Sequence, residues 1–290
     1  MTTLPDWLDR DEYPFTPRRF ETADGAMSYV DIGEGRPIVF VHGTPTWSFL
    51  YRRFIREFSR DHRCVAPDHL GFGLSDKPEG APYRPADHAR RLAALLDTMR
   101  LRDITLVVHD FGGPIGLSFA LEHPDRVRNL VVFNTWMWST RRDVRTRLLV
   151  AMLGSPLGRW LYLERNFAAA SVLRAAFADK SKLTPATYRH YTSVAASPRE
   201  RIAQFALVRE LVDSSGWYDD LWRRVEAIQH KPALLLWGMK DIAFRPRDLA
   251  RWRSALTNSR IAQFANAGHF VQEEAPESAI AVMREMIDRT

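Results

Sequence analysis

Six short apolar runs, rich in β-branched residues, restrict the fold of this chain more than any other feature of its sequence. They occupy residues 37–41, 64–67, 104–108, 130–133, 233–236 and 261–264. Most are continuous rather than alternating, which is typical of strands buried on both faces of a parallel sheet. Helical patterns separate them, such as residues 86–99, where apolar side chains recur at helical spacing. The alternation predicts an α/β fold with a mostly parallel central sheet flanked by helices.

The alternation stops near Trp136, and a strand pattern resumes only at Pro232. The chain between these points has helical patterns. Turn signals divide it at Gly154-Ser155-Pro156, Thr184-Pro185, Ser197-Pro198 and Ser214-Ser215-Gly216. We therefore expect a helical insertion over residues 136–225, within an α/β core formed by residues 1–135 and 226–290.

Composition and charge narrow the possible partners. The 290 residues include 41 basic and 35 acidic side chains, and the net charge of +6 is mild for this length. The arginines are spread along the chain and no recognition motif accompanies them, so we expect no nucleic-acid partner. No apolar stretch approaches the roughly 20 residues that span a bilayer, and we expect no membrane partner.

Two features of the sequence bear on the cellular compartment. The single cysteine, Cys64, cannot form a disulfide within the chain, which favours a reducing compartment. The first residues, MTTLPDWLDRDEYPF, lack the apolar stretch of a signal peptide. We expect a cytoplasmic protein.

The first candidate catalytic residue is Asp110. Ligands of open α/β sheets bind beyond the carboxyl ends of the strands, so the residues that follow each run are informative. After residues 104–108 the chain reads His109-Asp110-Phe111-Gly112-Gly113 and then becomes helical. This is the pattern of a nucleophile elbow, a sharp strand-to-helix turn that presents one side chain above the sheet. Alternatively, Asp110 only caps the following helix.

Two more candidates follow later strands. Asp241 comes shortly after residues 233–236, and His269 follows residues 261–264. An acid in such a position orients an imidazole and stabilises its charged form. Taken singly, Asp241 is better explained as a turn residue and His269 as a residue of a surface loop. Their order along the chain, nucleophile then acid then histidine, is that of the α/β-hydrolase triad, and it predicts a triad of Asp110, Asp241 and His269.

The loop after residues 37–41 supplies the fourth candidate. In this fold an early loop provides one backbone N–H of the oxyanion hole, and the residue after the nucleophile provides the other. We expect these donors to be the amides of Thr44 and Phe111, although the HGTP segment also reads as a simple proline turn. No histidine has metal-ligand spacing such as HExxH, so we expect no metal and no other cofactor.

Four separated segments resemble those of haloalkane dehalogenases and their epoxide-hydrolase relatives. They are HGTPTWSFLYR at 42–52, APDHLGFGLSDKP at 66–78, VHDFGGP at 108–114 and AGHFVQEEAPE at 267–277. The resemblance covers nearly the whole chain and implies an α/β-hydrolase core with a helical cap at 136–225. It also implies Asp110 as the nucleophile, His269 as the base and Asp241 as the acid. In some members the acid follows an earlier strand, where this chain has Asn134.

Two positions depart from the dehalogenase pattern. Typical dehalogenases hold the leaving halide with a tryptophan N–H directly after the nucleophile and with an asparagine amide in the HGNP segment. This chain has Phe111 and Thr44 there, and phenylalanine has no side-chain donor. By analogy with oxyanion-hole deletions, one missing donor costs about 3 kcal/mol, or about a hundredfold in rate. The candidate residues for the substrate or leaving-group pocket are Thr44, Phe111, Trp136, Trp138, Trp160 and Phe270.

These residues favour one function and leave two alternatives. In dehalogenation, Asp110 displaces a halide from carbon, and water activated by His269 hydrolyses the resulting alkyl-enzyme ester. Epoxide hydrolysis uses the same two steps but needs acidic O–H donors. The tyrosines of the expected cap that could serve are Tyr162, Tyr188, Tyr191 and Tyr218. The third reading is a non-catalytic binding protein, against which the complete triad argues. We favour a dehalogenase whose partners are a small apolar organic substrate and water.

Overall fold

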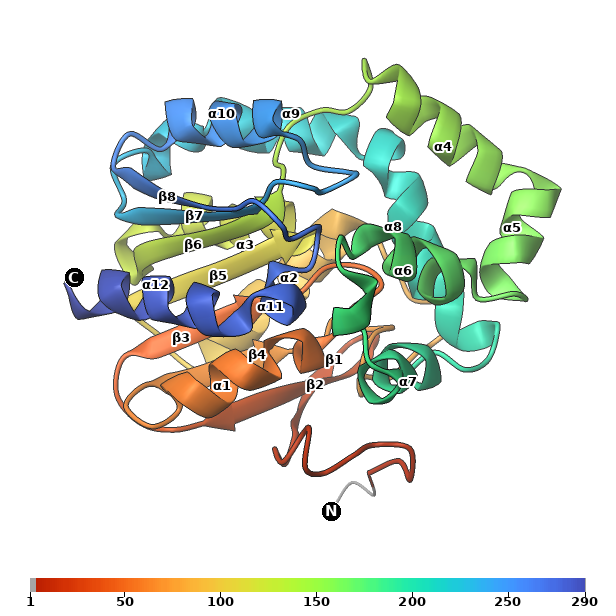
Figure 1. Ribbon diagram of the computed structural model, residues 1–290, viewed down its shortest axis with the longest axis horizontal. Coiled ribbons are helices and arrows are strands. Elements are labelled where there is room, and N and C mark those ends of the chain that lie inside the picture. The colour runs from red at the N-terminus through yellow and green to blue at the C-terminus, as the bar shows by residue number, and fades with distance from the viewer. Residues whose placement is uncertain (1–3, 290) are drawn as a thin grey trace.

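A central sheet organises the molecule. The computed structural model describes residues 4–289, and these form a sheet of eight strands in the order β1-β2-β4-β3-β5-β6-β7-β8 (Figure 1). The strands are β1 (Arg18–Thr22), β2 (Gly25–Ile32), β3 (Pro37–Val41), β4 (Arg63–Pro67), β5 (Ile104–Asp110), β6 (Val127–Thr135), β7 (Ala233–Gly238) and β8 (Ser259–Phe264). Neighbours from β4 across to β8 are parallel, whereas β2 is antiparallel to both β1 and β4. The six predicted runs coincide with β3 to β8, which confirms the predicted mostly parallel sheet.

The antiparallel pair β1 and β2 is absent from the sequence prediction. β1 lies at the edge of the sheet and its side chains are exposed or half-buried. Arg18, Arg19 and Glu21 occupy much of this short strand, and charged residues are common on edge strands because they discourage pairing with other chains. Such a strand has no continuous apolar run by which the sequence could reveal it.

Helices cover both faces of the sheet (Figure 1). They are α1 (Arg52–Phe58), α2 (Pro85–Thr98), α3 (Gly112–Glu122), α4 (Val144–Gly154), α5 (Pro156–Leu163), α6 (Leu173–Ala176), α7 (Pro185–Ser193), α8 (Ile202–Asp213), α9 (Ser215–Arg223), α10 (Pro246–Ala255), α11 (Val271–Glu274) and α12 (Pro276–Asp288). The helices α2, α3, α9 and α10 contribute to the apolar cluster on one face of the sheet, and α1 and α12 to the cluster on the other.

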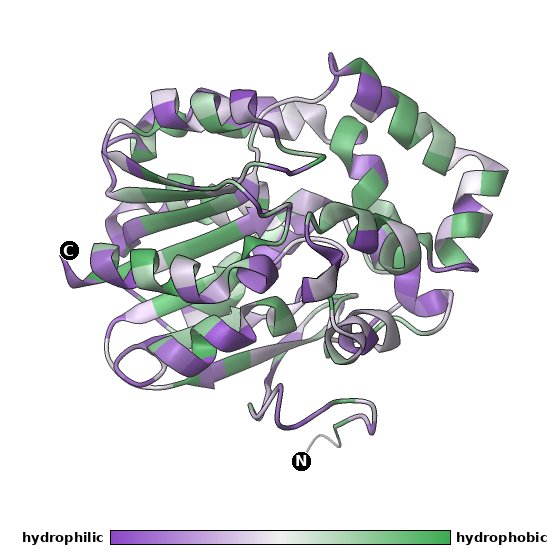
Figure 2. Ribbon diagram, in the orientation of Figure 1, coloured by the Kyte–Doolittle hydropathy of each residue, from purple (hydrophilic) through white to green (hydrophobic). Residues whose placement is uncertain are grey.

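The two apolar clusters explain the continuous runs. Along β3, Val39 and Val41 belong to the cluster on one face, whereas Ile38 and Phe40 belong to the cluster on the other. Because successive side chains of a strand point to opposite faces, a strand covered on both faces needs an apolar residue at every position. Figure 2 shows this hydrophobic character along β5, β6 and β7.

The chain between β6 and β7 forms α4 to α9. Figure 1 shows α4 to α8 beyond the edge of the sheet at which the parallel strands end. Two of these helices, α5 and α7, begin at predicted turn signals. The side chains of Ser155 and Thr184 accept hydrogen bonds from backbone amides at their N-termini. The last helix, α9, instead packs against α3 of the core, with Tyr218 and Leu221 in its apolar cluster. The division into a core and a cap at 136–225 stays a prediction.

Within residues 4–289, no helix combines the length and the apolar character that crossing a bilayer requires.

Candidate active site

Asp110 occupies a strained turn between β5 and α3. Its backbone has a φ of 51°, which lies in the left-handed region that residues other than glycine rarely adopt. Gly113 lies so close to β6 that a Cβ atom there would be 1.9 Å from the Thr135 hydroxyl, which itself donates to the Asp110 carbonyl. Phe111, not Asp110, is the N-cap residue of α3, and it makes no side-chain cap. The alternative reading of Asp110 as a helix cap is therefore wrong.

The loop after β3 binds the Asp110 carboxylate. The Thr44 amide donates to Asp110 Oδ1 at 2.8 Å. A Cβ atom on Gly43 would lie 2.2 Å from the same oxygen, so only glycine permits this close approach. Burial raises the pKa of Asp110, while His269 and the amides of Phe111 and Thr44 lower it, and the net shift is upward. Both expected oxyanion donors thus act on the carboxylate.

His269 lies between the two carboxylates. Its Nε2 atom is 3.8 Å from Asp110 Oδ2, and its Nδ1 atom is 2.8 Å from Asp241 Oδ2. The shorter contact is a hydrogen bond, whereas the longer one is not. Nε2 forms no hydrogen bond with any residue of the described range 4–289, which leaves it available to a water molecule beside Asp110. Burial lowers the pKa of His269, but the Asp241 and Asp110 carboxylates outweigh it, and the net shift is upward.

Asp241 accepts four hydrogen bonds. Its Oδ1 accepts from the amides of Ala243 at 2.7 Å and Phe244 at 3.2 Å. Its Oδ2 accepts from His269 and also from Asn134 Nδ2 at 2.8 Å. Asn134 is anchored in turn, because its Oδ1 accepts from the Gly238 amide at 2.8 Å. Sequence reasoning treated Asn134 only as the absence of an acid and missed this donor. The predicted parallel sheet could have indicated this contact, because β6 ends beside β7 and the residues at the ends of neighbouring parallel strands lie close together.

The loop that carries His269 is bound to the helical insertion. The His269 amide donates to the Ala176 carbonyl at 2.9 Å. The Glu274 carboxylate accepts from the Gly268 amide at 2.7 Å and from the Asp179 amide at 2.8 Å. The position of the imidazole thus depends on residues about ninety positions earlier in the chain. No sequence pattern indicated these contacts.

A cavity of about 920 Å³ opens above the triad. Its walls include Asp110, Asp241 and His269 and five of the six pocket residues expected from the sequence: Thr44, Phe111, Trp136, Trp138 and Phe270. Trp160 is not among the lining residues and is 48% exposed on α5. The cavity lies within the size range of small-molecule sites.

The donors near Asp110 differ from those expected of a halide site. The Phe111 ring packs edge-on against Trp136 at 4.8 Å between centroids. The Trp136 indole N–H is buried and has no hydrogen-bond partner among residues 4–289. Tyr162 on α5 lines the cavity. Burial raises the pKa of Tyr162, the Thr44 hydroxyl lowers it and the Asp110 charge raises it, with a net upward shift. Tyr162, Thr44 and Asp110 thus line the same cavity.

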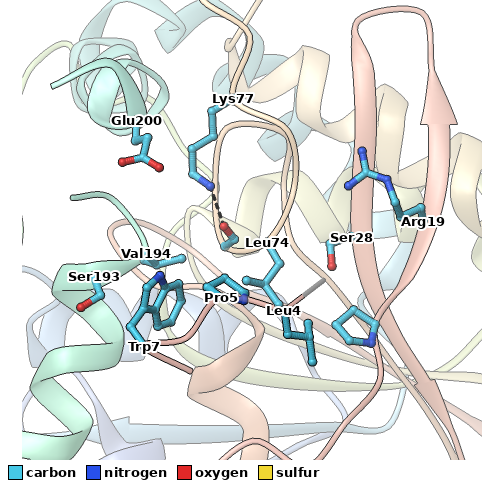
Figure 3. Close-up of a pocket in the computed structure, with 12 residues that line it drawn as sticks. Leu4, Pro5, Trp7, Arg19, Ser28, Leu74, Lys77, Ser193, Val194 and Glu200 are labelled. Carbon is cyan, nitrogen blue, oxygen red and sulfur yellow. Dashed lines mark hydrogen bonds between the residues drawn. The ribbon is translucent and has the colours of Figure 1, made fainter. Parts of the chain in front are cut away.

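A second cavity, of about 180 Å³, lies away from the triad (Figure 3). Trp7, Leu74 and Lys77 are among its walls. The Lys77 ammonium donates to the carbonyls of Gly73 at 2.7 Å and Ser75 at 3.3 Å. Asp110, Asp241 and His269 are not among its lining residues, so the larger cavity is the candidate active site.

The fold and the elbow define the class of protein. A family model described as the alpha/beta hydrolase fold matches residues 36–276. The chain therefore belongs to the α/β-hydrolase family and is a hydrolase.

Individual relatives refine this placement. Haloalkane dehalogenase 2 of Mycobacterium tuberculosis is 36% identical over 275 residues, which cover 94% of this chain and 95% of that protein. The cis-3-alkyl-4-alkyloxetan-2-one decarboxylase of Xanthomonas campestris is 32% identical, with coverage of 96% and 97%. The crystal structure of haloalkane dehalogenase DatA from Agrobacterium tumefaciens matches with a TM-score of 0.83 at 28% identity, with coverage of 94% and 96%. The predicted resemblance to haloalkane dehalogenases is confirmed.

Proposed function

We propose that the protein hydrolyses carbon–halogen bonds of small apolar compounds through a covalent ester on Asp110. The observation that carries this proposal is a carboxylate at the elbow whose Oδ1 is held by the Thr44 amide, with His269 Nε2 3.8 Å from Oδ2. The similarity to haloalkane dehalogenases indicates the substrate class.

The first step forms the ester. A carboxylate oxygen of Asp110 attacks the sp3 carbon, a C–O bond forms, and the carbon–halogen bond breaks with its electron pair leaving on the halide. Burial of Asp110 favours this step because it removes water that would otherwise solvate the nucleophile.

The second step restores Asp110. His269 takes a proton from water, and the water oxygen attacks Cγ of the ester. The negative charge that develops on the carbonyl oxygen is bound by the amides of Thr44 and Phe111. When the tetrahedral intermediate collapses, the alcohol leaves with a proton from His269, and the Asp110 carboxyl group releases the remaining water proton to solvent, which balances the charge of the halide. Asp241 stabilises the imidazolium between these transfers.

The leaving group needs donors, and two hydroxyls are available. Tyr162 and Thr44 both line the cavity beside Asp110, whereas Phe111 has no side-chain donor. In this proposal the two O–H groups bind the departing halide in place of the tryptophan and asparagine that typical dehalogenases use.

The same observation favours a second candidate, epoxide hydrolysis. A phenol can transfer its proton, which an alkoxide leaving group needs and a halide does not. Asp110 would bond to a ring carbon, the ring C–O bond would break, and the ring oxygen would take the proton of Tyr162. The relatives named for an oxetanone, a four-membered oxygen-containing ring, are consistent with a strained oxygen ring as substrate.

One experiment separates the candidates. The His269→Phe variant should form the ester but fail to hydrolyse it. We would incubate it with bromoalkanes and with epoxides and map the adducts by mass spectrometry. The double variant Asp110→Asn, His269→Phe is the matched control and should form no adduct.

The outcomes are distinct. An alkyl adduct on Asp110 from a bromoalkane supports dehalogenation. If only the epoxides form an adduct, which is then a hydroxyalkyl ester, epoxide hydrolysis replaces dehalogenation as the proposed function. Adding Tyr162→Phe to the His269→Phe variant should slow the formation of the epoxide adduct by about a hundredfold, which is the cost of one lost hydrogen-bond donor. A folded protein that forms no adduct with either class contradicts both proposals.

A further inference from the structure

Exposed apolar side chains are concentrated on one part of the molecule. Nine large hydrophobic residues are exposed among residues 4–289. Six of them lie on α4 and α5, namely Val144, Leu148, Leu149, Met152, Leu157 and Trp160. Single exposed apolar residues are ordinary, but a contiguous group marks an interaction surface. We call the outward faces of α4 and α5 the outer surface.

The outer surface is formed by residues that face away from the rest of the insertion. Val144, Leu148 and Met152 are four residues apart on α4 and form one stripe, with exposed fractions of 62%, 66% and 55%. The opposite side of α4 packs against α5 and α8. In Figure 1, α4 and α5 lie at the end of the molecule farthest from the C-terminus.

Positive charge surrounds these apolar side chains. Residues 141–165 include six arginines, Arg141, Arg142, Arg145, Arg147, Arg159 and Arg165, and only two acids, Asp143 and Glu164. Asp143 pairs with Arg247 of the core at 2.8 Å. None of the six arginines forms an ion pair within residues 4–289, and the Arg165 guanidinium lies 5.7 Å from the Trp160 ring.

The active-site cavity opens on the same surface. Leu149 and Met152 line the cavity and are also 41% and 55% exposed. Arg145, Val172 and Ile242 are further lining residues with exposed side chains. The apolar stripe of α4 therefore continues into the cavity above Asp110.

We propose that the outer surface docks on an anionic lipid bilayer. Leucine and tryptophan side chains bordered by arginines suit the boundary between headgroups and acyl chains. A second copy of the chain fits less well, because a two-fold interface would place the same arginine-rich surface on both sides, and like charges oppose each other there.

This proposal revises an expectation from the sequence. The sequence predicts no membrane partner because no segment can span a bilayer, but docking on the surface of a bilayer requires no span. If the proposed hydrolysis of apolar compounds holds, substrates dissolved in the bilayer would enter the cavity directly at Leu149 and Met152.

Vesicle sedimentation tests the docking. The full chain should sediment with vesicles of phosphatidylcholine mixed with phosphatidylglycerol, and far less with phosphatidylcholine alone. The double variant Leu148→Glu, Leu157→Glu changes two exposed residues outside the cavity walls and should lower binding by roughly tenfold or more. Arg142→Gln and Arg147→Gln should each lower it by about fivefold. The control Ile32→Glu, at an exposed apolar residue on β2, should bind as the unaltered chain does.

Three results would overturn the proposal. The first is no binding to anionic vesicles by the folded chain, and the second is equal binding by the Leu148→Glu, Leu157→Glu variant. The third is a stable dimer in light scattering that this variant abolishes, which would assign the surface to a second copy. Turnover of a short, water-soluble bromoalkane or epoxide should be unchanged in the variant, so a failed docking test is distinguishable from a failed proposed function.

Discussion

At the scale of single residues, the proposed carboxylate nucleophile would give the amides of Thr44 and Phe111 two successive roles. The Thr44 amide already donates to Asp110 Oδ1 in the free protein. In the proposed mechanism, the carbonyl oxygen of the ester occupies this region after the first step, and it becomes the oxyanion on attack by water. The donors therefore need little rearrangement between the two steps, which is the condition for effective electrostatic stabilisation.

The pKa of His269 leads to a prediction on pH dependence. Hydrolysis of the ester needs a neutral imidazole, and the nearby carboxylates raise the pKa of His269 above its ordinary value of 6.5. In the ester Asp110 carries no charge, so Asp241 is the main carboxylate beside the imidazole, and the rate of ester hydrolysis should fall as pH decreases through a midpoint that Asp241 raises. The Asp241→Asn variant should lower both the rate and the midpoint, because it removes the main charge that stabilises the imidazolium. Single-turnover measurements across pH test this, and a midpoint that Asp241→Asn leaves unmoved would contradict it.

Asn134 should act on the reaction through Asp241. Its amide donates to the same Asp241 oxygen that accepts from His269. Removing it in Asn134→Ala concentrates the charge of Asp241 on His269, so the pH midpoint of ester hydrolysis should rise. The lost hydrogen bond to a charged group should also cost about 1.5–3 kcal/mol of stability.

Two measurements check the role of Asn134. Denaturant unfolding gives the stability, and the single-turnover pH profile gives the midpoint. The exposed amide of Asn258, changed in Asn258→Ala, is the control and should alter neither quantity. A loss of stability without any shift of the midpoint would reduce Asn134 to a structural residue.

At the scale of elements, the junction of β5 and α3 depends on close packing against β6. A methyl group at Gly113 would lie 1.9 Å from the Thr135 hydroxyl, which supports the Asp110 carbonyl. Gly113→Ala should therefore lower the free energy of unfolding by about 1–3 kcal/mol, the usual cost of overpacking. It should also reduce activity, because the shift of β6 against α3 displaces Asp110.

Gly216 in α9 provides the matched control for Gly113. No atom lies within 4 Å of a Cβ at Gly216. Gly216→Ala should leave activity unchanged and stabilise the protein by about 0.5–1 kcal/mol, because alanine is the better helix former. Thermal unfolding and activity assays of both variants test the pair. Equal effects of the two substitutions would contradict the packing argument.

At the scale of the whole molecule, a buried ion pair joins the core to the helical insertion. Arg52 on α1 donates to Glu273 Oε1 at 2.6 Å, and the Tyr191 hydroxyl on α7 donates to the same oxygen at 2.6 Å. All three side chains are buried. Glu273 also belongs to the segment that follows His269, so the ion pair connects α7 to the loop that carries this histidine.

Removing one partner of this ion pair should be costly. Glu273→Gln leaves the Arg52 charge buried without its main counter-ion and should lower the free energy of unfolding by about 3–5 kcal/mol. Glu285→Gln breaks the exposed pair with Arg260 and should cost at most about 1 kcal/mol. Urea unfolding of both variants makes the comparison. A loss at Glu273 as small as that at Glu285 would show that the buried pair does not hold the two parts together.

Most of the core sheet could be predicted from the sequence because burial on both faces requires continuous apolar runs. β3 to β7 meet this requirement and were predicted, and β8, which lies at the other edge of the sheet and is exposed or half-buried, was predicted as well. β1 and β2 were missed because an edge hairpin needs only partial burial. Asp110, Asp241 and His269 stood out for a related reason: parallel strands end at one edge of the sheet, so residues that follow them are brought together.

The sequence by itself determined the fold class, the elbow at Asp110 and the order of the triad, because short-range patterns specify strands and turns. Only the tertiary structure decided which side chains surround them. Asn134 on β6 reaches Asp241 in the loop after the neighbouring β7, Glu274 joins Gly268 to Asp179, and Trp160 faces outward although its position in the insertion suggested the cavity. These contacts depend on how the insertion packs over the sheet, and that packing is set by side chains distant in the sequence, which no local pattern records.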